Sequence, residues 1–161
     1  MSFEAILFDC DGVLVDSELI TNRVLHAMLN ESGWVLSEED CMRIFIGKTV
    51  RSETARIEAE TGQRLTDAWM SDFYERRNVR LRAELVAIEG AADAVKAVHT
   101  QLQGKIAVAS GADKPKVVMQ LERVGMLPYF GDWVFSGHDL PRTKPWPDVY
   151  LAAAAAVGIA P

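Results

Sequence analysis

The sequence predicts an α/β fold in which a parallel sheet is interrupted by a long helical segment. Three short apolar runs, at residues 4–7, 105–110 and 132–136, are typical of buried strands because they are too short for helices. Helical patterns separate the later runs, and strands that alternate with helices favour a parallel sheet with right-handed crossovers. From residue 16 to about residue 83 no strand pattern occurs, so we expect helices alone there.

The helical segment divides into four predicted helices. Apolar residues recur at helical spacing from Leu19 until Gly33 ends the first one. Ser37, followed by three acidic residues, indicates the start of the second, which ends at Gly47. We expect a third helix over residues 50–61 and a fourth from Thr66 to an Arg-rich end at residues 76–82. Later helices are expected over residues 91–102, 112–124 and 147–156.

Composition and charge exclude several classes of protein. The chain has 161 residues, of which 49% are hydrophobic and 25% charged, so it can form one domain with an inserted subdomain. The net charge of -6 does not favour nucleic-acid binding, and no apolar run approaches membrane-spanning length. Glu4 and the immediate strand do not resemble a signal peptide, and Cys10 and Cys41 suggest no disulfide framework. We therefore expect a cytoplasmic protein, with Cys10 a buried thiol on the first strand.

Two carboxylates follow the first predicted strand. Asp9 and Asp11 alternate at its carboxyl end, the edge of an α/β sheet where ligands bind, and Gly12 permits a sharp turn after them. Acidic side chains buried together need a cation or hydrogen bonds, and Mg²⁺ prefers such oxygen ligands. The residues alone equally allow a solvated turn or a Ca²⁺ loop at this point.

The longer run around these residues, Phe8–Glu18, resembles the first motif of the haloacid dehalogenase-like phosphohydrolases. The greatest similarity is to the branch of β-phosphoglucomutases and sugar-phosphate phosphatases. The resemblance implies that Asp9 is the nucleophile that forms an aspartyl-phosphate, that Asp11 is the general acid and base, and that both belong to a Mg²⁺ site. Dehalogenases lack the second Asp of the motif, so cleavage of a carbon–halogen bond is disfavoured.

The same resemblance implies the domain organisation. Residues 1–15 and 84–161 would form a Rossmann-like core, the haloacid dehalogenase-like core. Residues 16–83 would form an inserted α-helical cap domain.

Two further motifs fit the core. Val108–Gly111 resembles the second family motif, in which the hydroxyl of Ser110 binds a phosphate oxygen and the amides of Gly111 and Ala112 add donors. Lys144–Asp148 resembles the third, in which Lys144 neutralises the nucleophile and the phosphoryl group, and it implies a cis Lys144–Pro145 bond. Taken alone, a Ser at a strand end such as Ser110 is more often a helix cap, and a Lys in a Pro-rich loop such as Lys144 is more often a surface lysine.

The predicted cap resembles the substrate-binding part of the cap in this branch of the family. The loop from Phe45 to Arg51 is similar to the one in which an Arg grips a distal anionic group, so the resemblance implies that Gly47, Lys48 and Arg51 bind substrate. Arg77, with Asn78, matches a second substrate-facing position. A solvated loop lysine at Lys48, and a basic helix end at Arg77, are the alternatives.

Two departures from the family pattern stand out. Thr21 occupies the position of a His that the mutases carry, which favours hydrolysis over isomerisation. The fourth family motif supplies further acidic Mg²⁺ ligands on a strand beside the Asp9 strand, but no acidic residue follows Asp148 in these 161 residues. We expect that the motif lies in a C-terminal part beyond Pro161. The alternative is a fragment, with an exposed strand edge and weakened Mg²⁺ binding.

These observations predict a Mg²⁺-dependent phosphatase for a small phosphorylated metabolite, a sugar phosphate or sugar-acid phosphate. We expect a monomer with no nucleic-acid or membrane partner. The alternatives are a β-phosphoglucomutase-like mutase and an incompetent fragment that only binds phosphorylated ligands.

Overall fold

The computed structural model describes residues 3–160 of the chain. They divide into two compact units, each with its own core. Residues 3–16 and 85–160 form an α/β unit, and residues 17–84 form a helical unit. No helix within residues 3–160 combines the length and apolar character needed to cross a membrane.

The α/β unit is built on a three-stranded parallel sheet. Its strands β1 (Ile6–Phe8), β2 (Ile106–Ser110) and β3 (Val134–Ser136) lie in the order β1-β2-β3. Phe8 pairs with Val108, and Ser110 pairs with Ser136. Because the strands are parallel, all three carboxyl ends lie at one edge of the sheet, which is where this class of fold places its ligands.

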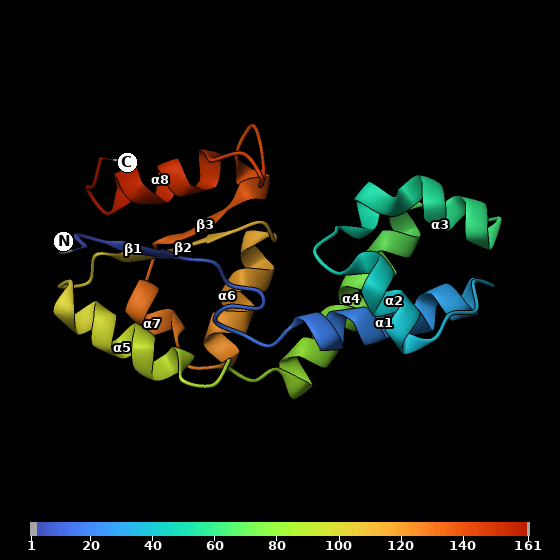
Figure 1. The fold of residues 1–161 in the computed structure, drawn as a ribbon, viewed down its shortest axis with the longest axis horizontal. Coiled ribbons are helices and arrows are strands. Elements are labelled where there is room, and N and C mark those ends of the chain that lie inside the picture. The colour runs from blue at the N-terminus through green and yellow to red at the C-terminus, as the bar shows by residue number, and fades with distance from the viewer. Residues whose placement is uncertain (1–2, 161) are drawn as a thin grey trace. The chain divides into compact units, whose positions relative to one another are not determined.

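Helices cover both faces of this sheet (Figure 1). Helix α8 lies on one face, while α6 and α7 lie on the other, with α5 packed against α7. The bounds are α5 Ala91–Gln101, α6 Lys114–Arg123, α7 Leu127–Phe130 and α8 Asp148–Ala156, with a short 3-10 turn η2 at Gly137–Asp139. The core beneath α8 is formed by Val149, Ala153 and Val157 against Ala107 and Ala109 of β2. Small side chains at these contacts allow the helix to approach the sheet closely.

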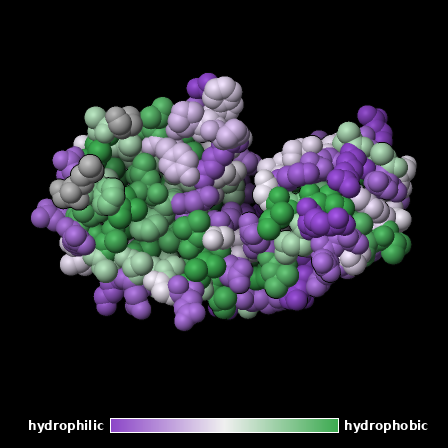
Figure 2. All heavy atoms as spheres, viewed as in Figure 1, coloured by the Kyte–Doolittle hydropathy of each residue, from purple (hydrophilic) through white to green (hydrophobic). Residues whose placement is uncertain are grey.

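An apolar region surrounds the edge strand β1. Figure 2 shows apolar residues gathered over the α/β unit on the side in view. A groove of the α/β unit is lined by residues that precede or form β1 and by residues in or after α8: Ala5, Leu7, Tyr150, Leu151, Ala154 and Ile159. Within the described residues β1 is thus an edge strand with an apolar groove beside it.

The helical unit packs four helices around an aromatic core. Its elements are α1 (Glu18–Glu31), α2 (Glu38–Phe45), the 3-10 turn η1 (Val50–Glu53), α3 (Thr54–Thr61) and α4 (Asp67–Glu84). Trp34 contacts Phe45 edge-to-face, and Phe73 stacks on Trp69. The Ser37 hydroxyl accepts a hydrogen bond from the Asp40 amide at 3.0 Å, which confirms the predicted cap of α2.

The predicted α/β class is confirmed, but three local predictions were wrong and one helix was missed. Residues 50–61 do not form one helix, because Thr49 caps a 3-10 turn before α3 begins. Helix α6 begins at Lys114 rather than residue 112, since the Asp113 side chain caps it. Helix α7 was not predicted, because four residues are too short to show helical periodicity. Cys10 lies beyond β1, which ends at Phe8.

Candidate active site

The chain makes a tight turn immediately after β1. Gly12 has a φ of 71°, a left-handed conformation that glycine adopts without steric cost. Its amide donates to the carbonyl of Val15 at 2.9 Å, and the Leu14 amide donates to the carbonyl of Cys10 at 2.9 Å. Asp9 and Asp11 are therefore fixed on a hydrogen-bonded turn at the carboxyl edge of the sheet.

Asp9 has two partners on two segments of the chain. Its Oδ1 accepts from the Cys10 amide at 2.7 Å, and its Oδ2 lies 2.9 Å from Lys144 Nζ. Lys144 lies in the loop between β3 and α8, and the expected cis Lys144–Pro145 bond is confirmed. The sequence-predicted residues Asp9 and Lys144 are thus brought into direct contact.

Lys144 is held as a cation. Burial lowers its pKa, but the Asp9 carboxylate and the Tyr150 hydroxyl together outweigh burial and raise the pKa above its ordinary value. Lys144 Nζ also lies 4.9 Å from the centre of the Tyr150 ring, an arrangement in which the ring face attracts the charge. Tyr150, on α8, was not singled out from the sequence.

Ser110 ends β2 at the same edge of the sheet. Its side chain is buried, and its Oγ accepts from the Ala112 amide at 3.0 Å. The N-cap of α6 is instead Asp113, which accepts from the Lys116 amide at 3.0 Å. Ser110 therefore does not cap α6, and the Ala112 amide, expected as a phosphate donor, is bound to Ser110. A Cβ at Gly111 would be 3.7 Å from Lys144 Cδ, so Gly111 lies beside that lysine.

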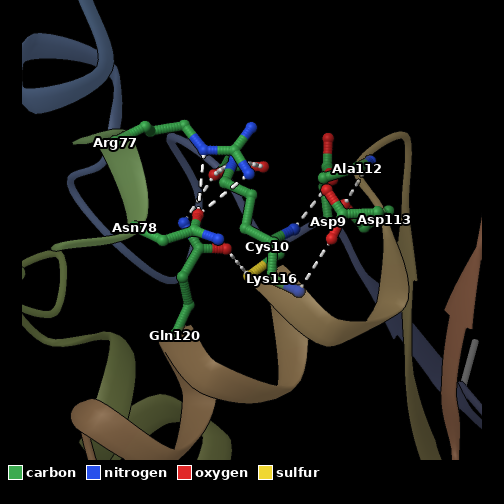
Figure 3. Close-up of polar contacts among 10 residues, drawn as sticks. Asp9, Cys10, Arg77, Asn78, Ala112, Asp113, Lys116 and Gln120 are labelled. Carbon is green, nitrogen blue, oxygen red and sulfur yellow. Dashed lines mark hydrogen bonds and ion pairs between the residues drawn. The ribbon is translucent and has the colours of Figure 1, made fainter. Parts of the chain in front are cut away.

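Two residues that the sequence reasoning missed hold Asp11. Figure 3 shows Lys116 and Gln120 projecting from one face of α6. Lys116 Nζ lies 2.8 Å from Asp11 Oδ1 and 2.9 Å from Oδ2, and Gln120 Nε2 donates to Oδ1 at 2.8 Å. The i, i+4 spacing could have shown that both residues share a helix face, but not that this face meets a carboxylate.

Cys10 is a buried thiol that completes this cluster. Its Sγ donates to Gln120 Oε1 at 3.7 Å. Burial, followed by the negative charge of Asp11, raises the pKa of Cys10 to about 12. The thiol is therefore neutral near pH 7, as expected of a packing residue rather than a nucleophile.

The remaining predicted substrate residues lie in the helical unit. Gly47 adopts a φ of 71° after α2. In the following loop and 3-10 turn, Lys48 Nζ pairs with Glu53 at 3.1 Å, and Arg51 pairs with Asp67 at 3.1 Å.

Arg77, on α4, is buried. Its guanidinium lies 4.8 Å from the Tyr74 ring centre and donates to the Asn78 side-chain oxygen at 2.9 Å. Arg77 thus contacts two neighbours on its own helix, whereas Arg51 is exposed.

The oxygen donors suit a hard cation. Magnesium is commonly held by one or two carboxylates together with other oxygens, waters and substrate phosphate. Asp9 would supply a carboxylate oxygen and Asp11 its backbone carbonyl oxygen, since the Asp11 carboxylate is bound by Lys116 and Gln120. Within residues 3–160, no group of three or more His, Cys, Asp or Glu side chains gathers at a metal-binding distance. The donor chemistry therefore fits Mg²⁺ with a partly hydrated coordination shell.

Comparison with known proteins identifies the family. Residues 3–161 match the haloacid dehalogenase-like hydrolase family model. The chain is 34% identical to the 6-phosphogluconate phosphatase of Escherichia coli strain K12 over 157 residues, covering 97% of this chain and 69% of that protein. It is also 25% identical to the putative phosphatase YhcW of Bacillus subtilis strain 168, covering 98% of this chain and 71% of that protein.

Solved structures agree with this grouping. A haloacid dehalogenase-like protein from Agrobacterium tumefaciens superposes with a TM-score of 0.81 at 31% identity, covering 98% of this chain and 70% of that chain. A haloacid dehalogenase family hydrolase from Deinococcus radiodurans, solved with bound phosphate and sodium, has a TM-score of 0.74 at 28% identity, covering 98% and 68%. The chain therefore belongs to the haloacid dehalogenase-like hydrolase family.

Proposed function

We propose that this hydrolase is a Mg²⁺-dependent phosphatase that cleaves a small phosphorylated metabolite through an aspartyl-phosphate on Asp9. The contact of Lys144 Nζ with Asp9 Oδ2 at 2.9 Å is the observation that carries the proposal. A carboxylate beside an ammonium is suited to attack phosphorus, and the same cation can neutralise the transferring group. The similarity to a 6-phosphogluconate phosphatase supports a sugar or sugar-acid phosphate as substrate.

The proposed reaction uses two carboxylates in turn. Asp9 attacks phosphorus in line, and a protonated Asp11 transfers its proton to the departing oxygen. Asp11 then takes a proton from the water that attacks the aspartyl-phosphate, which releases phosphate and restores Asp9. Lys144 and the Ser110 hydroxyl stabilise the phosphoryl oxygens. Asp9, through its carboxylate, and Asp11, through its backbone carbonyl, would hold Mg²⁺, which would supply positive charge at the same group.

The helical unit is proposed to act as the cap that binds the rest of the substrate. Arg51 is exposed at the surface of its unit, and its guanidinium already binds a carboxylate, Asp67. A substrate phosphate or carboxylate can take the place of such an exposed partner. Gly47, Lys48 and Arg77 complete the proposed cap contacts, and Gly111 the core contacts. The cytoplasmic location and the monomeric state remain predictions.

The proposal is tested by phosphate release from a panel of sugar and sugar-acid phosphates. We expect the wild-type protein to turn over with Mg²⁺ and to lose activity after chelation, with recovery when Mg²⁺ is restored. Asp9→Asn should lose all detectable turnover while keeping the wild-type circular dichroism spectrum. Mg²⁺-dependent activity that persists in Asp9→Asn would overturn the proposal.

A further inference from the structure

Lys116 is a buried cation that the proposed reaction has not used. It is only 7% exposed, on the first turns of α6. A buried ammonium is costly unless it is paired, and Lys116 Nζ contacts both oxygens of the Asp11 carboxylate, at 2.8 and 2.9 Å. An ammonium that spans both oxygens restricts rotation of that carboxylate.

Gln120 adds a second restraint from the same helix face. Its side chain is completely buried, and its Nε2 donates to Asp11 Oδ1 at 2.8 Å. Its Oε1 accepts from the thiol of Cys10 at 3.7 Å, so both ends of the amide have a partner. Lys116 and Gln120 together therefore donate to both oxygens of Asp11.

Helix α6, which carries these two side chains, is itself held in place. Its N-terminus is capped by Asp113, and the helix packs on the sheet against β3. Figure 3 shows the two side chains reaching from successive turns of α6. A fixed helix that presents two donors to one carboxylate sets its direction, and small displacements of a reacting group strongly reduce rates.

We propose that Lys116 and Gln120 are positioning residues that orient the Asp11 carboxyl group for proton transfer to the leaving oxygen. This inference rests on the proposed phosphatase function and assigns how its acid is held. Neither residue needs to touch the substrate, since both act through Asp11.

The test is the dependence of kcat/KM on the leaving group. A series of aryl phosphates is used, from 4-nitrophenyl phosphate to phenyl phosphate, whose phenols differ in acidity. Departure of 4-nitrophenolate needs little help from an acid, whereas less acidic phenols need more. An oriented acid therefore gives a shallow dependence, and loss of that acid, as in Asp11→Asn, gives a steep one.

Lys116→Met and Gln120→Met should both steepen the slope of log(kcat/KM) against the acidity of the phenol, toward the slope of Asp11→Asn. We expect kcat/KM for phenyl phosphate to fall by about 10- to 100-fold, with less than about a threefold change for 4-nitrophenyl phosphate. Lys114→Met, an exposed lysine on the first turn of α6, is the matched control and should keep the wild-type slope. Lys116→Arg keeps the charge and serves if Lys116→Met does not fold.

The outcomes separate this inference from the proposed function. If the wild-type protein releases no phosphate from any aryl phosphate with Mg²⁺, the phosphatase proposal fails and this inference falls with it. If Asp11→Asn steepens the slope but the Lys116 and Gln120 variants keep the wild-type slope, or lose rate equally on every phenol, only the positioning role is overturned.

Discussion

Lys144 Nζ lies 2.9 Å from Asp9 Oδ2, joining the loop after β3 to the end of β1. The lysine is also positioned by Tyr150, whose ring centre is 4.9 Å from Nζ. This one contact brings the first and third predicted motifs together at the carboxyl edge of the sheet. It is the relationship on which the proposed chemistry depends.

Replacing Lys144 should damage catalysis far more than stability. Lys144→Met removes a cation from the proposed transition state, and loss of one such group lowers kcat by about 100-fold or more. The pair is partly exposed, so the free energy of unfolding should fall by no more than about 1 kcal/mol. Phosphate release and urea denaturation measure the two effects. Lys96→Met, an exposed lysine on α5, is the control, and equal activity in both variants would contradict the assignment.

Arg51→Ala should lower kcat/KM for substrates with a distal anionic group more than for generic aryl phosphates. If Arg51 grips a distal anionic group, kcat/KM for 6-phosphogluconate should fall by about tenfold or more, while 4-nitrophenyl phosphate, which lacks such a group, is affected little. Arg43→Ala is the matched control, because Arg43 pairs with Asp40 on an exposed helix surface of the same unit. An equal loss of kcat/KM on both substrates would exclude binding of a distal anionic group by Arg51.

Gly137 leaves no room for a side chain beneath the loop that carries Lys144. A Cβ at this position would overlap the Thr143 hydroxyl and lie 3.2 Å from the Thr143 Cα. Gly137→Ala should therefore lower the free energy of unfolding by about 1–3 kcal/mol. Gly111→Ala, where the added Cβ would be at 3.7 Å from its nearest neighbour, should cost less. Urea denaturation of the two variants compares them, and equal stability would show that the loop adjusts freely.

Both cysteines should be unreactive in the folded protein. Burial raises the pKa of Cys10 to about 12 and that of Cys41 to about 11. Because the thiolate is the reactive form, a raised pKa moves reactivity to more alkaline pH. We expect slow labelling by iodoacetamide from pH 7 to 9, and rapid labelling of both thiols after denaturation. Rapid modification of either thiol at pH 7 in the native protein would contradict the burial and the raised pKa of that cysteine.

The sequence predicted the strands because their apolar runs are local features. The runs at residues 4–7 and 105–110 identified β1 and β2, and the parallel arrangement followed from the helices between strands. Ser110 and Asp9 could be assigned to one edge of the sheet for the same reason. Boundaries were less accurate where a side chain sets them, as at Asp113, whose cap moves the start of α6.

The contacts of Lys116 and Gln120 with Asp11 could not be predicted from the sequence. Spacing shows that Lys116 and Gln120 share a face of α6, but a Lys on a helix is usually exposed. Only the packing of α6 beside the turn after β1 brings both side chains to Asp11. Tyr150 is similar, because its contact with Lys144 depends on how α8 lies on the sheet.

If Asp9 carries the phosphoryl group, the acyl phosphate can be trapped on this residue. The protein is mixed with substrate and Mg²⁺, quenched, and treated with borohydride, which reduces an acyl phosphate to an alcohol. We expect peptide mass spectrometry to find homoserine at position 9 only when substrate is present. Steady phosphate release with unmodified Asp9, or reduction at another carboxylate, would contradict it.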